Sequence, residues 1–414
     1  MDVIAQRIAG SLLFGVLLGC AGPTNNPTTS TTAIDSAKYK GTYAYDADFL
    51  KQHTQKVIEL AEPGGQAKLL LSADYQGRVM TSTANGDSGT SFGWINYNLL
   101  ASGEKKKQFN PVGGEERFWL GPEGGQYALY FKKGDSFSIA NWQVPAVIDT
   151  DMYDVAESSG TKAVFTKSAT LTNYSGSTFN IGIKRSINLL NKEALAQKLQ
   201  VSLPEGIQSV GYETINEVTN TGNEDWKQDK GLLSIWLLCM MTPTEKTTVI
   251  IPFHPQANAK SFITDNYFGA MPPERLIVKD SVLYFTCDGK KRSKIGLSPV
   301  IAKPIAGSFD FNKNVLNLVV YAVDKNGLYV NSKWELQKQP YKGDVVNSYN
   351  DGPLEDGSQL GPFYEIESSS SAKALKKGET QQYTQMTCHL QGDYESLRQL
   401  ARQLLGVDLN DIKK

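Results

Sequence analysis

The stretch "AVFTKSATLTNYSGSTFNIGIKRSINLL", from Ala163 to Leu190, decides the fold class. It contains two runs that are rich in β-branched and aromatic residues, and the turn sequence Asn-Tyr-Ser-Gly separates them. Runs of this composition, bounded by Gly, Asn, Asp or Pro, are typical of β-strands. The stretch therefore predicts two strands joined by a turn.

Similar strand patterns fill most of the remaining chain. They occur at residues 68–84, 126–131, 210–222, 231–241, 247–253, 276–289, 311–323, 329–336, 362–370 and 381–392. Helical patterns are scarce and occur at residues 46–60, 191–201 and 392–407. Many short strands with few helices predict an all-β fold, a large antiparallel β-sandwich with a few peripheral helices.

The first residues differ from this pattern. Residues 1–19 carry Arg7 and then a short apolar run, which is typical of a secretory signal peptide and too short for a permanent membrane span. Their end, Leu17-Leu18-Gly19-Cys20, resembles the lipobox of bacterial lipoproteins. This resemblance implies cleavage before Cys20 and a lipid on its sulfur. The alternative is a plain signal peptide followed by a chance cysteine.

A lipidated Cys20 implies that the membrane is a partner and that the protein is anchored in the bacterial cell envelope. No acidic residue directly follows Cys20, which favours the outer membrane. Residues 20–40 are rich in Pro, Thr, Asn and Ser and predict a flexible tether. No low-complexity linker interrupts residues 41–414, which predict a single domain.

Charge and motif content exclude several function classes. The chain has 42 basic and 43 acidic residues, a net charge of −1, and this balance argues against a nucleic-acid partner. It has no P-loop, GxGxxG, GxSxG, HExxH, CxxC or Cys/His metal spacing, so neither a cofactor nor a metal is predicted. Cys239, Cys287 and Cys388 lie in apolar or alternating runs and are expected to be buried free thiols.

Several stretches resemble a domain-of-unknown-function family of bacterial lipoproteins. They are "PVGGEERFWLGPEGGQYALYF" (111–131), "NWQVPAVIDT" (141–150), "GKKRSKIGLSP" (289–299), and residues 212–253 and 349–380. The resemblance covers nearly all of the chain after residue 40. It implies the supersandwich fold of galactose mutarotase-like proteins and implies no activity.

The stretch "YEIESSSSAKALKKGETQQYTQMTCHL" (364–390) resembles the closing segment of aldose mutarotases. In that family a strand with a catalytic Glu precedes Leu-x-Pro-Gly-Glu and a last strand; here Glu365 or Glu367 takes the Glu position, and Lys377 replaces the Pro. Carboxylates two residues apart share one face of a strand, and their proximity raises one pKa, which suits a general base. The alternative is an exposed edge strand with solvated glutamates.

The resemblance to mutarotases also implies a histidine acid. The chain has only His53, His254 and His389, and none of them lies in the family's Asn-His-x-Tyr-Phe-Asn pattern. This departure argues against epimerase activity.

Other side chains have the chemistry of a sugar site, where Trp faces cover C–H groups and polar groups bond the hydroxyls. The candidates for ligand contacts are Arg117, Trp119, Glu123, Trp142, Arg292 and Lys294. For both tryptophans the alternative is core packing. For Arg117 the alternative is an ion pair with a nearby glutamate (Glu115, Glu116 or Glu123).

Asp351 is a further candidate ligand contact, in the oxygen-rich loop "NSYNDGPLEDG" (347–357). Such a loop can also hold calcium, although an Asn-Asp-Gly turn explains most of its composition.

Three functions remain open from the sequence. The first is a lipid-anchored envelope protein that binds a carbohydrate. The second is a sugar-active enzyme, epimerase-like or a lyase or hydrolase relative, with Glu365 or Glu367 as base. The third is a structural envelope lipoprotein without a ligand, in which side chains fill the face that would otherwise bind it.

Overall fold

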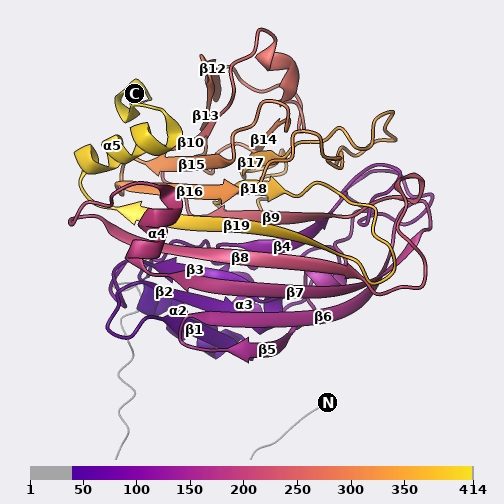
Figure 1. Ribbon diagram of the computed structural model, residues 1–414, viewed down its shortest axis with the longest axis horizontal. Helices are drawn as coiled ribbons and strands as arrows, with labels where there is room; N and C mark the ends of the chain where they lie inside the picture. Colours follow the sequence, from indigo (N-terminus) through magenta and orange to yellow (C-terminus); the bar gives the residue numbers. More distant parts are fainter. Residues whose placement is uncertain (1–39, 413–414) are drawn as a thin grey trace, which may run out of the picture. The chain divides into compact units, whose positions relative to one another are not determined.

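The computed structural model describes residues 40–412, which form three β-sheets and four α-helices (Figure 1). The helices are α2 (Tyr43–His53), α3 (Tyr97–Ser102), α4 (Lys192–Leu199) and α5 (Tyr394–Leu405). The smallest sheet consists of β1 (Val57–Ala61), β2 (Lys68–Ser72) and β3 (Arg78–Thr83). The predictions for residues 1–19, and for the tether up to residue 39, lie outside the described residues.

Two larger sheets make up the body of the fold. The ten-stranded sheet has the order β12 (Leu276–Lys279), β13 (Val282–Thr286), β10 (Thr247–Pro252), β15 (Ile305–Asp310), β16 (Val315–Tyr321), β19 (Thr380–Gln391), β8 (Gln208–Asn220), β7 (Thr178–Leu190), β6 (Lys162–Thr172) and β5 (Asp154–Ser158). The six-stranded sheet has the order β11 (Ile263–Thr264), β14 (Ser293–Leu297), β17 (Val346–Asn350), β18 (Tyr364–Ser369), β9 (Ser234–Met241) and β4 (Arg117–Gly121). All pairs of neighbouring strands are antiparallel, which confirms the predicted all-β antiparallel architecture.

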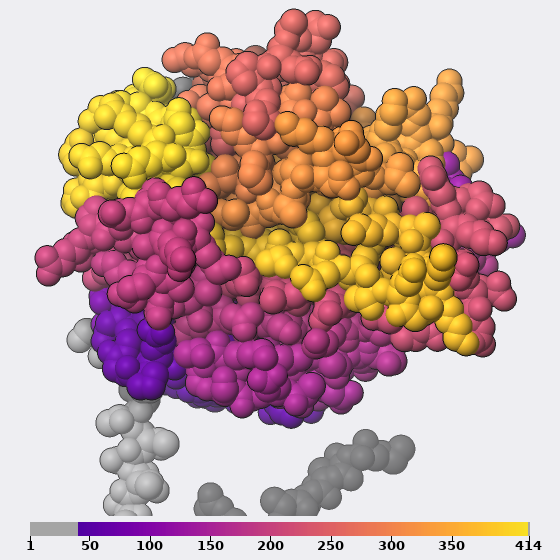
Figure 2. Space-filling view, viewed as in Figure 1, coloured from indigo at the N-terminus to yellow at the C-terminus, as the bar shows by residue number. Residues whose placement is uncertain are grey.

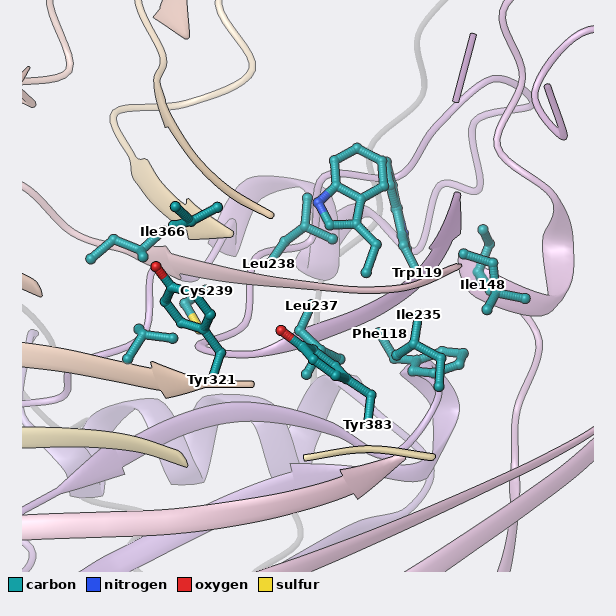
Figure 3. Close-up of a cluster of buried hydrophobic side chains, with 14 of the residues drawn as sticks. Phe118, Trp119, Ile148, Ile235, Leu237, Leu238, Cys239, Tyr321, Ile366 and Tyr383 are labelled. Carbon is teal, nitrogen blue, oxygen red and sulfur yellow. The ribbon is translucent and has the colours of Figure 1, made fainter. Parts of the chain in front are cut away.

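The six-stranded sheet packs face to face on the ten-stranded sheet. Between them lie side chains from both sheets, including Leu237 and Ile366 on one side and Tyr321 and Tyr383 on the other (Figure 3). All four are at most 5% exposed, and full burial of such a side chain contributes about 1.5–3 kcal/mol. This double layer is the predicted β-sandwich.

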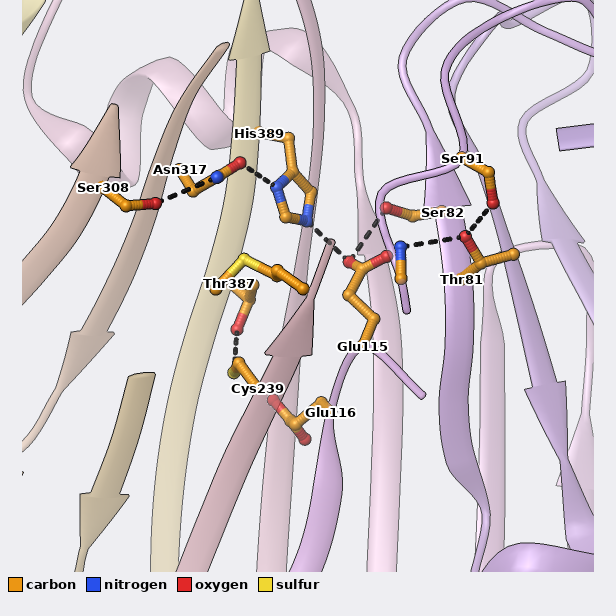
Figure 4. Close-up of polar contacts among 12 residues, drawn as sticks. Thr81, Ser82, Ser91, Glu115, Glu116, Cys239, Ser308, Asn317, Thr387 and His389 are labelled. Carbon is orange, nitrogen blue, oxygen red and sulfur yellow. Dashed lines mark hydrogen bonds and ion pairs between the residues drawn. The ribbon is translucent and has the colours of Figure 1, made fainter. Parts of the chain in front are cut away.

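Charged residues also lie between the layers (Figure 4). His389 on β19 contacts the carboxylate of Glu115 at 2.7 Å and the amide oxygen of Asn317 at 2.6 Å. Arg185 on β7 pairs with Glu116 at 3.0 Å, and the side chains of both pairs are fully buried. The opposite charges of Arg185 and Glu116 offset part of the cost of burying each of them.

The helices predicted at residues 191–201 and 392–407 are confirmed as α4 and α5. They cover part of the other face of the ten-stranded sheet, where Leu195, Leu397 and Leu400 pack with Leu318 and Leu390. Figure 2 shows α5, in yellow, directly beside the magenta region of α4.

The predicted helix at residues 46–60 is wrong in its second half. The hydroxyl of Thr42 caps α2 at its start, and the helix ends at His53, where Thr54 adopts an extended conformation. Val57 and Ile58 are β-branched, and they pair with β2 as part of β1 instead of continuing the helix.

The strands predicted at residues 126–131 and 329–336 are absent. The first segment turns back on itself, with backbone bonds from Ala128 to Gly125 and from Leu129 to Pro122. The second forms one bridge, between Tyr329 and Lys342. Aromatic rings of both segments pack on other rings instead: Tyr130 contacts Trp119 of β4, and Trp334 stacks on Trp142.

Cys239, Cys287 and Cys388 are buried free thiols, as predicted. Within residues 40–412, no helix combines the length and the apolar character that a membrane span requires.

Candidate functional site

One face of the six-stranded sheet points away from the ten-stranded sheet, and most predicted site residues lie on it. We call it the outer face and define it by Arg117, Trp119, Trp236, Lys294, Glu365 and Glu367. Strand pairing places them together, because Trp119 lies opposite Trp236, while Leu238 lies opposite both Arg117 and Glu367. Glu365 and Glu367 share this face, as their two-residue spacing on β18 predicts.

Arg117 and Glu365 form a buried ion pair on this face. Their Nη2 and Oε1 atoms are 2.8 Å apart, and the two side chains are 4% and 7% exposed. The guanidinium of Arg117 also stacks on the ring of Trp119, 4.1 Å from its centre. The partner of Arg117 is therefore Glu365 from a distant strand, and not one of the neighbouring glutamates considered from sequence.

The pKa of Glu365 is shifted towards neutrality. Burial raises it to about 7, and Glu367 adds to the increase, whereas Arg117 opposes it. A carboxyl group with a pKa near 7 exchanges its proton at physiological pH, as a general base must.

Glu367 occupies the centre of the face. Its Oε2 atom accepts hydrogen bonds from Lys294 Nζ at 2.8 Å and from the indole nitrogen of Trp236 at 3.0 Å. Lys294 reaches it from β14, two strands away across β17. Burial lowers the pKa of Lys294, but Glu367 and Glu123 outweigh burial, so the net shift is upward and keeps the ammonium charged.

Glu123 adds a third carboxylate from the loop that follows β4. A backbone bond to the hydroxyl of Ser332 anchors this loop at 3.2 Å. Burial raises the pKa of Glu123, while Lys294 opposes the increase, so the two side chains lie close enough to interact. Three carboxylates and two cations thus converge on one face.

Aromatic rings enclose these charges. Trp119 lies edge-on to Trp236 with ring centres 5.4 Å apart, and it also contacts Tyr130 at 5.4 Å. Trp142 stacks between Tyr130 at 6.2 Å and Trp334 at 6.0 Å. Trp142 is partly buried in this stack. It therefore packs as a core residue and also lies beside the charged side chains of the outer face.

Arg292 and Asp351 lie at the rim. Arg292 stacks its guanidinium on Phe268, 4.2 Å from the ring centre. Asp351 accepts hydrogen bonds from the hydroxyl of Tyr349 at 2.6 Å and from the backbone of Gly361 at 3.0 Å. Asp351 thus fixes Tyr349, which is itself on the outer face. Within residues 40–412, no group of three His, Cys, Asp or Glu side chains is arranged to hold a metal ion.

Several buried polar atoms on the outer face lack a hydrogen-bond partner. They are Nε and Nη1 of Arg117, Nε1 of Trp119 and Oε1 of Glu367. A buried polar atom without a partner costs about 1–3 kcal/mol, so donors and acceptors of this kind favour an incoming polar ligand.

The face is covered rather than open. The nearest pocket has a volume of about 90 Å³ and runs between Phe268, Met271, Arg292 and Lys294. Ligand pockets of drug-sized molecules usually measure about 300–1,000 Å³. A ligand larger than a few atoms therefore needs covering residues to move, and those nearest to Lys294 in this pocket belong to the segment 264–272.

Sequence reasoning missed several residues of the site. Trp236 lies in the apolar run of β9, where alternation is hidden because both faces of this central strand are buried. Trp334 lies in a segment predicted to be a strand. Tyr267, whose hydroxyl donates to Asp344 at 2.7 Å, lies in a segment without a strand or helix pattern.

The histidines do not reach the outer face. His389 lies between the two sheets, His254 is exposed after β10, and His53 is at the end of α2. The histidine acid that the resemblance to mutarotases implies therefore has no counterpart on the outer face.

A model of the family of unknown function DUF6786 matches residues 41–414. Solved structures similar to the fold include a putative aldose 1-epimerase from Escherichia coli K12 (11% identity, 82% of this chain and 99% of that chain, TM-score 0.47). Another is a galactose mutarotase-like protein from Lactobacillus casei (10%, 81% and 100%, TM-score 0.47). A third is the Slr1438 protein from Synechocystis (11%, 82% and 98%, TM-score 0.49). No curated protein was found to be similar to this chain.

Proposed function

We propose that this chain, which belongs to the DUF6786 family of unknown function, binds a carbohydrate on the outer face of its six-stranded sheet. The observation that carries the proposal is the convergence of Glu123, Glu365, Glu367, Arg117 and Lys294 beneath tryptophan rings. Carboxylates and cations bond sugar hydroxyls, and indole faces cover sugar C–H groups.

The unpartnered polar atoms support the same proposal. Nε1 of Trp119 and two nitrogens of Arg117 are donors without acceptors, and Oε1 of Glu367 is an acceptor without a donor. A sugar hydroxyl both donates and accepts, so a few hydroxyls satisfy a mixed set of this kind. A purely apolar ligand would leave all of these atoms without partners.

The test is a glycan-array screen of the purified protein, followed by calorimetry on each glycan that binds. Glu367→Gln removes the central negative charge with little change in shape, and we expect at least tenfold weaker binding, which corresponds to about 1.4 kcal/mol. Glu213→Gln is the matched control, because Glu213 also pairs with a lysine, Lys198, but lies on the ten-stranded sheet. Absence of binding to every glycan would refute the proposal, and so would equal binding by Glu367→Gln.

A sugar-active enzyme is the second candidate, and the pKa of Glu365 near 7 favours it. In this case Glu365 removes a proton from a bound sugar. Glu365→Gln should then abolish turnover while binding persists. An unchanged rate in this variant would exclude Glu365 as the base.

We also propose that a lipid on Cys20 anchors the protein in the bacterial envelope. This rests on the lipobox-like sequence Leu17–Cys20. Cys20→Ser should move the protein from the membrane fraction to the soluble fraction of expressing cells. Retention of the variant in the membrane fraction would contradict the proposal.

A further inference from the structure

A cluster of cations beside the covered pocket forms no ion pair with any residue that the structure describes. Lys290, Lys291 and Arg292 occupy the turn between β13 and β14, and within residues 40–412 none of them forms an ion pair. The guanidinium of Arg292 donates no hydrogen bond among these residues, and its Nε atom is buried. Unpaired cations at the mouth of a pocket favour an anionic ligand.

The turn that carries these cations is held in place. The side chain of Asn350 accepts a bond from the backbone of Gly289 at 2.9 Å and donates one to the carbonyl of Lys291 at 2.9 Å. Gly352 packs against the same backbone, because a Cβ atom there would lie 2.4 Å from the nitrogen of Lys291. The exposed cations Lys290 and Lys291 are therefore carried by a backbone that these contacts hold in place.

Arg292 has the geometry of an anion ligand. The guanidinium of Arg292 lies 4.2 Å from the ring centre of Phe268 and donates no hydrogen bond among residues 40–412, so its nitrogens are available to a ligand. A planar guanidinium binds a carboxylate or a sulfate through two parallel hydrogen bonds. The carboxylate of Asp351, whose pKa Arg292 helps to lower against the larger effect of burial, already accepts hydrogen bonds from Tyr349 and Gly361 and forms no ion pair with Arg292. Asp265, the only acidic residue that lines the pocket in the described part of the chain, forms no ion pair.

We infer that the bound carbohydrate is acidic, and that Arg292 and Lys291 bind its carboxylate or sulfate group. The inference rests on the proposed function. Lys294 lines the pocket and also bonds Glu367, so it joins the cationic turn to the centre of the outer face. An acidic sugar ring placed between them contacts Arg292 with its charged group and Glu367 with its hydroxyls.

The test compares acidic oligosaccharides with neutral counterparts of the same length. Probes are uronate oligosaccharides and their carboxyl-reduced forms, and sulfated oligosaccharides and their desulfated forms, titrated into the purified protein. We expect the acidic member of at least one pair to bind at least tenfold more tightly, and its affinity to fall with increasing salt, because ions screen exposed charges.

Variants distinguish an effect of Lys291 and Arg292 from a general effect of removing positive charge from the protein. The double variant Lys291→Ala/Arg292→Ala should lose the preference for the acidic probe and keep its affinity for the neutral one. The double variant Lys51→Ala/Lys56→Ala is the control, because both lysines are exposed on the amino-terminal part of the fold and form no ion pair among residues 40–412. Arg292→Lys keeps the charge without the planar fork, and we expect an intermediate loss.

The outcomes distinguish this inference from the proposed function. Equal affinity for acidic and neutral probes would overturn the inference and leave carbohydrate binding intact. An acidic preference that survives in Lys291→Ala/Arg292→Ala would also overturn it. Absence of binding to all probes would overturn both. Binding of free sulfate alone, without any oligosaccharide, would overturn the carbohydrate assignment.

Discussion

The ion pair between Arg117 and Glu365 joins side chains that are 248 residues apart in the sequence. Both are buried, and a buried ion pair is seldom more stable than an apolar pair of similar volume. The pair is therefore poorly explained by stability alone. Its unpartnered donors, Nε and Nη1 of Arg117, remain available to a polar ligand.

A double-mutant cycle measures the contribution of this pair. Arg117→Leu should destabilise the fold by about 3–5 kcal/mol, because it leaves Glu365 buried without an opposite charge. The double variant Arg117→Leu/Glu365→Leu should recover most of this loss. Urea unfolding followed by circular dichroism measures each free energy. A double variant less stable than Arg117→Leu would show that the pair holds the fold together.

The raised pKa of Glu365 predicts a dependence of stability on pH. The folded protein holds this proton up to about pH 7, whereas an unfolded glutamate releases it at about pH 4.3. The folded state binds more protons in this window, so the contribution of Glu365 to stability falls as the pH rises from 4.3 to 7.

Glu365→Gln removes this contribution. The difference in unfolding free energy between wild type and the variant should decrease from pH 4.5 to pH 7.5, by about 2–3 kcal/mol at 1.36 kcal/mol per pKa unit. Glu213→Gln serves as the control, and its difference from wild type should not fall by this amount over the same range. A constant difference for Glu365→Gln would show that Glu365 is ionised throughout.

At the residue scale, the sequence predicted which side chains share a face but not which of them touch. Alternation along a strand is local, so Glu365 with Glu367 and Arg117 with Trp119 follow from spacing alone. The contact of Arg117 with Glu365 depends on the register of β4, β9 and β18, which packing sets over the whole chain.

At the scale of elements, α5 shows why some segments are predictable. Leu397, Leu400 and Leu405 recur at helical spacing and are at most 2% exposed. The side chain of Asp393 caps the start of the helix, and Gly406 ends it with a φ of 72°. Segments 126–131 and 329–336 carry no such local signals. Their aromatic residues suggest strands, but their rings pack around Trp142 instead.

The packing of α5 predicts a measurable loss of stability. Leu400→Ala creates a cavity between the helix and the ten-stranded sheet and should cost about 2–5 kcal/mol. Gln403→Ala on the exposed side of the same helix should change stability by less than about 0.5 kcal/mol. Chemical unfolding compares the two variants. Equal effects would mean that α5 is not part of the cooperative core.

At the scale of the whole molecule, one layer of the sandwich serves stability and the other carries the polar face. One face of the ten-stranded sheet packs on the six-stranded sheet, and α4 and α5 cover part of its other face. The tryptophans of the candidate site come from β4, β9 and two loops; they are Trp119, Trp236, Trp142 and Trp334. The sequence predicted the sandwich, because alternating apolar residues and turn residues are local signals of β-strands. It did not predict that segment 264–272 covers the face, because that contact is made between loops.

The most direct test of the central claim is a crystal structure of the protein with the tightest-binding glycan from the array. We predict a sugar in contact with Glu367, Lys294 and Trp236, with segment 264–272 displaced and an acidic group on Arg292. A sugar bound elsewhere, with the ion pairs of Glu365 and Glu367 unchanged and the outer face still covered, would contradict the account.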